Sequence, residues 1–176
     1  MEISPDILHT AGARRFFEYW DSLPKRGFVP DRKDFNPAAI YSLMPSVSLL
    51  EIMSPERVEI RLLGTDLVDR IGIEVTGGNY LESFEPALRP AYLNILNTQI
   101  TFPCGRRTVL KTREESGILS RVEVLSLPLT HDAVGNPLIL SCFEPTESIG
   151  YEHGGREVKN FDDIQWIDIG AGVPAA

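Results

Sequence analysis

The sequence has few of the features that mark several large classes of protein. It contains only two cysteines and no CxxC pair, which excludes a disulfide scaffold and a cysteine-rich zinc site. No run of lysine or arginine is longer than two and the formal net charge is -8, so nucleic acid is not an expected partner. Every apolar run falls short of the roughly 20 residues that a membrane span needs.

What is present is typical of one ordinary globular domain. A chain of 176 residues, of which 43% are apolar and 24% charged, can build a single hydrophobic core. Its first residues lack a basic region followed by an apolar one, so they do not indicate a signal peptide. We therefore expect a cytoplasmic protein without membrane contact, with Cys104 and Cys142 buried as small apolar residues.

Three parts can be distinguished along the chain. Residues 1–45 are predicted to form an aromatic helix and a linker, residues 46–147 a core, and residues 148–176 a tail that docks on the domain or on a neighbour.

The first helix is predicted to begin at Ser4-Pro5 and to carry Phe16, Phe17 and Trp20 on one stripe. This stripe either packs against the domain or forms a subunit interface, and we expect it to contribute to a homodimer.

The core is predicted to open with a β-hairpin. Residues 47–52 and 58–65 are apolar or alternating runs separated by about five residues. Gly64 allows a turn into a short helix that Gly72 ends. A longer helix follows, reaching Ile100.

Three further strands are predicted after that helix. Residues 104–116 carry four basic residues and few large apolar ones, which is typical of an edge strand. Residues 120–132 are more apolar. Residues 138–143 are apolar in both phases, which favours a central strand covered on both faces.

The order of hairpin, helical insert and three-strand meander resembles a PAS domain. It is most similar to a bacterial single-domain PAS family formerly described as a domain of unknown function. The resemblance covers about Ala13 to Pro145. The residues that carry it are Tyr19-Trp20, Pro37-Ala38, Leu43-Met44-Pro45, Arg61-Leu62-Leu63-Gly64-Thr65, Ile71-Gly72, Val75-Thr76-Gly77 and Leu127-Pro128-Leu129.

This resemblance implies an α+β fold, with a five-stranded antiparallel sheet, helices on one face and an added N-terminal helix. It also implies a sensory or adaptor module of bacterial signal transduction that binds a small apolar ligand and acts through protein contacts. The expected partners are a second copy of the chain and an unidentified signalling protein. By predicted inward phase, the candidate ligand-binding residues are Leu62, Leu67, Tyr92, Leu96, Val109, Val124 and Cys142.

Two cofactors of PAS domains are disfavoured. Haem needs an axial ligand in or near the long helix, but His9, His131 and His153 lie outside it. Photochemical flavin attachment uses a cysteine in the helical insert, and residues 61–100 contain none. The identity of any cofactor stays open.

Catalytic and metal sites are not indicated. His131-Asp132 has no serine or cysteine nucleophile that can be placed beside it, and the acidic residues of the tail match no known metal-ligand spacing. Arg106, Arg107, Lys111 and Arg113 either bind an anion or an acidic partner, or serve solubility alone.

Two other classes of function remain as alternatives. One is a small cone-shaped α+β enzyme of the isomerase or cyclase type, and the other is an interaction protein with a filled core. The order of elements favours the PAS fold, so we expect no enzyme activity.

Overall fold

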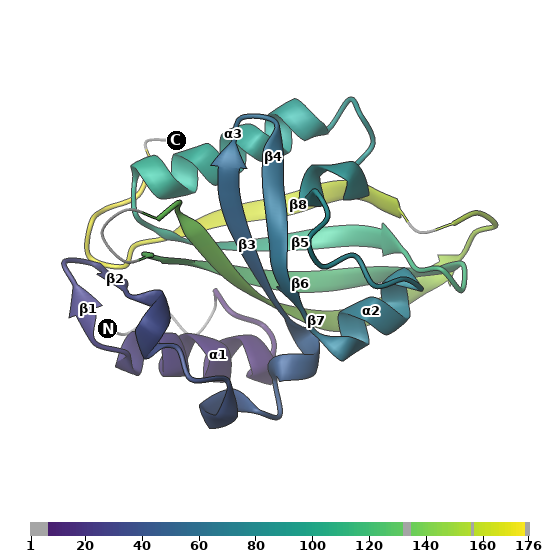
Figure 1. Ribbon diagram of the computed structural model, residues 1–176. Coiled ribbons are helices and arrows are strands. Elements are labelled where there is room, and N and C mark those ends of the chain that lie inside the picture. Colours follow the sequence, from purple (N-terminus) through teal and green to yellow (C-terminus); the bar gives the residue numbers. More distant parts are fainter. Residues whose placement is uncertain (1–6, 132–134, 156, 175–176) are drawn as a thin grey trace.

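The computed structural model describes residues 7–131, 135–155 and 157–174, arranged as a main antiparallel sheet with helices on both faces and a separate two-stranded sheet of β1 and β2 (Figure 1). Its N-terminal elements are α1 (Ala11–Ser22), β1 (Lys25–Arg26), β2 (Val29–Pro30) and the 3₁₀ helices η1 (Arg32–Asp34), η2 (Pro37–Ile40) and η3 (Met44–Ser46). The remaining elements are β3 (Val47–Ser54), β4 (Arg57–Leu63), α2 (Thr65–Ile71), the 3₁₀ helix η4 (Tyr80–Ser83), α3 (Arg89–Thr101), β5 (Gly105–Arg113), β6 (Ile118–Leu129), β7 (Leu138–Tyr151) and β8 (Glu157–Ile167).

The first helix begins later than the sequence predicts. Ser4-Pro5 lie outside the described residues, and α1 starts at Ala11. Thr10 is its N-cap, and the Thr10 side chain accepts a hydrogen bond from the backbone N–H of Ala13 at 3.2 Å.

In the part of the chain that is described, no helix combines the length and the apolar composition needed to cross a bilayer.

The main sheet has six strands in the order β4-β3-β7-β6-β5-β8. The predicted α+β class and the antiparallel pairing are confirmed, but the tail adds a sixth strand beside β5, drawn in yellow in Figure 1. The prediction that residues 104–116 form an edge strand is therefore wrong. Their positive charges face acidic residues of the tail, so that Arg113 pairs with Glu157 at 2.7 Å and with Glu152 at 2.9 Å.

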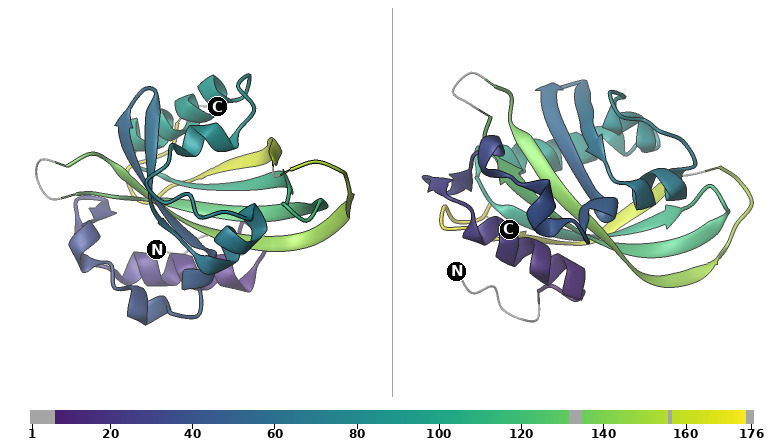
Figure 2. Two further views of the ribbon diagram at one scale, coloured as in Figure 1. Left: turned by 45° about the vertical axis from the view of Figure 1, so that its right-hand side comes forward. Right: turned by 60° about the horizontal axis from the view of Figure 1, so that its bottom comes forward.

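Helical layers cover the two faces of this sheet. Figures 1 and 2 show α1 along one face, called here the outer face, and α3 across the other, the inner face. Strand β7 is central, as expected, and its residues alternate between the two sides. Leu138, Leu140 and Cys142 join the cluster of α1, whereas Ile139 joins the cluster of α3.

The turn between β4 and α2 requires glycine. A Cβ atom at Gly64 would lie 2.1 Å from the backbone oxygen of Pro45, which no side chain tolerates. At the other end of α2, Gly72 has a φ of 79°, in the left-handed region that ends helices. Two glycines thus allow a seven-residue helix to turn back across the inner face.

Candidate ligand-binding site

A cavity of about 120 Å³ lies on the inner face, between α2, η4 and the sheet. It separates two apolar clusters, one that contains Leu50 and Tyr80 and another that contains Leu110 and Val122. All four of these side chains line it. The other apolar lining residues are Leu63, Leu67, Ile71, Phe143, Pro145 and Val158.

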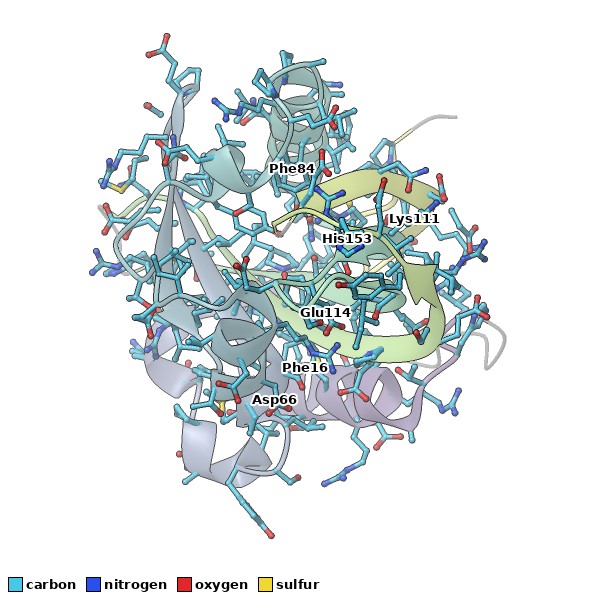
Figure 3. The ribbon with its side chains drawn as sticks, turned by 90° about the vertical axis from the view of Figure 1, so that its right-hand side faces the viewer. Phe16, Asp66, Phe84, Lys111, Glu114 and His153 are labelled. Carbon is cyan, nitrogen blue, oxygen red and sulfur yellow. The ribbon has the colours of Figure 1, made fainter. Side chains whose placement is uncertain are left out.

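The charged residues of the cavity are held in ion pairs at its rim. Arg70 contacts Glu114 at 2.8 Å, with side chains 36% and 16% exposed. The Arg113–Glu157 pair lies at the same rim, and Glu114 also accepts a hydrogen bond from the Ser120 hydroxyl at 2.9 Å. Figure 3 views the molecule from the side on which Glu114 lies, with Phe84 above it and Asp66 of α2 below it.

A row of buried polar residues crosses the inner face beside the cavity. Ser48 of β3 is paired with Ser141 of β7, Ser141 with Ser126 of β6, and Ser126 with Arg106 of β5. The two hydroxyls of Ser126 and Ser141 are 2.9 Å apart, and the Arg106 guanidinium donates to Ser126 at 3.2 Å. Ser48, at the other end of the row, lines the cavity.

Helix α3 covers the arginine end of this row. The guanidinium of Arg106 is 5.3 Å from the ring centroid of Tyr92 and donates to the Tyr92 hydroxyl at 3.3 Å. The amide of Gln99 donates to the backbone oxygen of Ser126 at 2.9 Å. Nearby, burial and then the neighbouring Tyr92 raise the pKa of the Tyr80 hydroxyl well above its usual value, so it stays protonated.

The sheet order and the helices that cross its inner face are those of a known family. A family model for the PAS domain matches residues 8–144, which is most of the chain. The chain belongs to the PAS domain family. A comparison with curated proteins found no match. The family assignment supports a sensory or signalling module in general terms and names no ligand or partner.

The PAS fold places the seven candidate ligand-binding residues in several environments. Leu67 lines the cavity. Tyr92, Leu96 and Val124 are buried in the two apolar clusters that flank it.

The other three candidates lie on the outer face. Leu62 packs against the cluster of α1, Cys142 is buried in that cluster, and Val109 lines an open polar recess. The inward phase that we assigned to these strand residues is therefore wrong, because both faces of this PAS sheet are covered and either phase can be buried.

The PAS core accounts for the aromatic stripe of α1 within the chain itself. Phe16, Phe17 and Trp20 are 0%, 5% and 0% exposed. The indole N–H of Trp20 donates to the backbone oxygen of Pro128 at 3.0 Å. Figure 3 shows Phe16 on the opposite side of the sheet from Phe84. A homodimer would need a different surface.

Arg107 links segments near the two ends of the chain on the outer face. It is 1% exposed, contacts buried Glu123 at 2.9 Å and also pairs with Asp163 of β8. The Glu123 carboxylate accepts hydrogen bonds from the backbone N–H groups of His9 and Thr10 at 2.9 and 2.8 Å. Neither Arg107 nor Arg106 is therefore a surface cation, and the anion-binding alternative fails at both residues.

Other candidate chemistry is not assembled in the described part of the PAS domain. Burial raises the pKa of the Cys104 thiol to about 11 and that of Cys142 further, which makes both thiols poor nucleophiles. His131 is exposed, and Asp132 lies outside the described residues. No group of three or more His, Cys, Asp or Glu side chains among the described residues could hold a metal ion.

Sequence reasoning missed most of the cavity wall. Leu110 and Val122 were available as apolar residues in alternating strands, but alternation defines two phases without saying which one faces the cavity. Ser48 was missed because it is a single small polar residue within the run VSLLEI. The alignment of Ser48 with Ser141 and Ser126 on neighbouring strands would have indicated a buried polar row, but this alignment follows only from the strand register.

Proposed function

We propose that this PAS domain is a sensory or adaptor module of signal transduction that binds a small, largely apolar ligand. The observation that carries the proposal is the cavity of about 120 Å³ between α2, η4 and the sheet. Its walls are mostly apolar and its charged residues are paired, so burial of a hydrocarbon surface would supply the binding free energy.

The proposed output is contact with other proteins rather than catalysis. Partners would be a second copy of the chain and a signalling protein, and neither nucleic acid nor membrane. The formal net charge of -8 supports this choice, since both phosphate backbones and anionic lipids would be repelled. Occupation of the cavity would act on partners by shifting α2 and η4, the segments that lie directly over it.

Mass spectrometry of the native protein tests the proposal. The protein is purified from its own host without denaturation, and bound molecules are then released by unfolding. We expect one small molecule per chain from the wild type and none from Leu67→Phe, whose larger ring would fill the cavity.

Ile73→Phe is the matched control, because Ile73 is 54% exposed just beyond α2 and lies outside the cavity. This variant should retain the molecule. A wild-type protein that releases nothing and binds no apolar probe would contradict the sensor proposal.

A further inference from the structure

One polar atom of the cavity wall has an unmet hydrogen-bonding capacity. Ser48 is 1% exposed, and its side chain lies on the inner face, where it lines the cavity. The side chains of its neighbours in sequence, Val47 and Leu49, lie on the outer face and pack in the cluster of α1. Among the described residues, no group forms a hydrogen bond with its hydroxyl oxygen. A buried hydroxyl without a partner is unfavourable, so its presence in an apolar wall calls for a partner that the described residues do not supply.

The neighbours of Ser48 are already engaged with one another. Ser141, its partner across the strands, shares its hydroxyl hydrogen bond with Ser126, and Ser126 also accepts from Arg106. Ser48 is thus the end of the row at which a hydroxyl has no partner among the described residues, and this end faces the cavity. The other unpaired atom of the row, Nε of Arg106, lies at the opposite end under α3 and outside the cavity lining.

The charges around the cavity indicate a neutral ligand. Both arginines at the rim have carboxylate partners, Glu114 for Arg70 and Glu157 for Arg113. A charged ligand would have to replace one of these ion pairs and lose its own hydration in an apolar chamber. An uncharged ligand would disturb neither pair.

The volume limits the size of the ligand. A cavity of about 150 Å³ is sufficient for benzene in an apolar protein interior. The cavity of about 120 Å³ found here is slightly smaller, although it opens at the rim between paired side chains. A ligand of about six or seven non-hydrogen atoms, extending toward the open rim, is the size that fits.

We propose that Ser48 is a specificity residue that selects a compact, uncharged ligand bearing one hydroxyl or carbonyl oxygen. The inference rests on the proposed function, because it assigns the chemistry of the same cavity. The ligand oxygen shares a hydrogen bond with the Ser48 hydroxyl, and its hydrocarbon part contacts Leu67, Leu110 and Phe143.

The test compares benzene and phenol, which differ by one hydroxyl, as probes of the full chain by calorimetry or ligand-observed NMR. For wild type we expect both probes to bind. For Ser48→Ala we expect phenol to bind about tenfold more weakly, because its hydroxyl would be buried unpaired, while benzene affinity changes less than about twofold. Cysteine is close to serine in size but is a weaker hydrogen-bonding group, so the phenol affinity of Ser48→Cys should lie between those of the wild type and Ser48→Ala. This second variant also serves as the test if Ser48→Ala does not fold.

Ser42→Ala is the control for loss of a hydroxyl, because Ser42 is exposed and outside the cavity. It should bind both probes as the wild type does. Benzoate, the charged analogue, should not bind measurably.

The possible failures are distinguishable. If benzene and phenol bind to the wild type but the ratio of their affinities is the same in Ser48→Ala and Ser48→Cys, the role of Ser48 is refuted and the cavity remains a binding site. If benzoate binds as tightly as phenol, the ligand is not selected as neutral. If neither benzene nor phenol binds to the wild type, the proposed function fails together with the inference.

Discussion

The two faces of the sheet use similar residues to different ends. On the outer face, α1 and the linker close over one continuous cluster in which Phe16, Trp20 and Leu127 are each 0% exposed. On the inner face, α2 and η4 leave a cavity between two smaller clusters. Close packing on the outer face therefore contributes stability, whereas the inner face has fewer van der Waals contacts because it encloses a cavity.

The largest expected effect compares the same substitution on both faces. Leu127→Ala should lower the free energy of unfolding by about 4 kcal/mol, because it empties space in a filled core. Leu67→Ala should cost about 2 kcal/mol, since Leu67 already borders a cavity and makes fewer contacts. Urea denaturation measures both. Equal costs would contradict the difference in packing between the faces.

The next effect concerns the ion pair that holds the start of α1 on the outer face. Glu123→Ala should cost about 3 kcal/mol in urea denaturation, because it removes the buried carboxylate that pairs with Arg107 and leaves only the half-exposed Asp163 as a carboxylate partner. The matched control is Glu147→Ala, which removes an exposed pair with Arg121 between β7 and β6. That variant should cost less than about 0.5 kcal/mol.

Glu123 also predicts a dependence on pH. Burial would raise the pKa of its carboxyl, but the N–H groups of His9 and Thr10 and the Arg107 guanidinium lower it below its usual value. Since the folded-state pKa is the lower one, the stability that ionised Glu123 contributes is lost as pH falls through that pKa. Glu123→Gln should therefore lose less stability than the wild type on acidification.

A smaller effect is expected at the indole of α1. Trp20→Phe keeps an aromatic ring on the outer face but removes the N–H that donates to Pro128. The substitution should cost about 2 kcal/mol, partly from the smaller ring and partly from the carbonyl left unpaired. A cost no greater than that of a surface substitution would mean that this hydrogen bond does not hold α1 in place.

The smallest effect has the opposite sign and also lies beneath α1. Burial first, and then the nearby carboxylates of Glu123 and Asp66, raise the pKa of Glu144. Because the folded state disfavours ionised Glu144, the wild type loses stability as pH rises from the unfolded-state pKa through the folded-state pKa. Glu144→Gln should thus be slightly more stable than the wild type at pH 7, and the difference should vanish below about pH 4 in thermal denaturation.

The sequence predicted the order of elements better than the residues of the site. The hairpin could be anticipated because Val58 and Ile60 alternate with Glu59 and Arg61, and the glycines at 64 and 72 mark both ends of α2. These are local features, and local steric and burial patterns are sufficient to read them.

The remaining features depend on contacts between distant segments. The tail could have been assigned to β5 only by matching its acids to the arginines that suggested an edge strand. The cavity depends on which phase of each strand faces α2, and with helices on both faces the apolar pattern alone does not decide this. Three of the seven predicted ligand residues lie on the outer face for that reason.

One guanidinium, that of Arg107, connects segments from opposite ends of the chain: His9 near the beginning, Glu123 in the middle and Asp163 near the end. Loss of β8 would expose the edge of β5. It would also remove the Asp163 partner of Arg107 and so weaken the contacts that hold the start of α1 on the outer face. The two terminal segments should accordingly detach together, so that limited proteolysis yields either the intact domain or one trimmed at both ends.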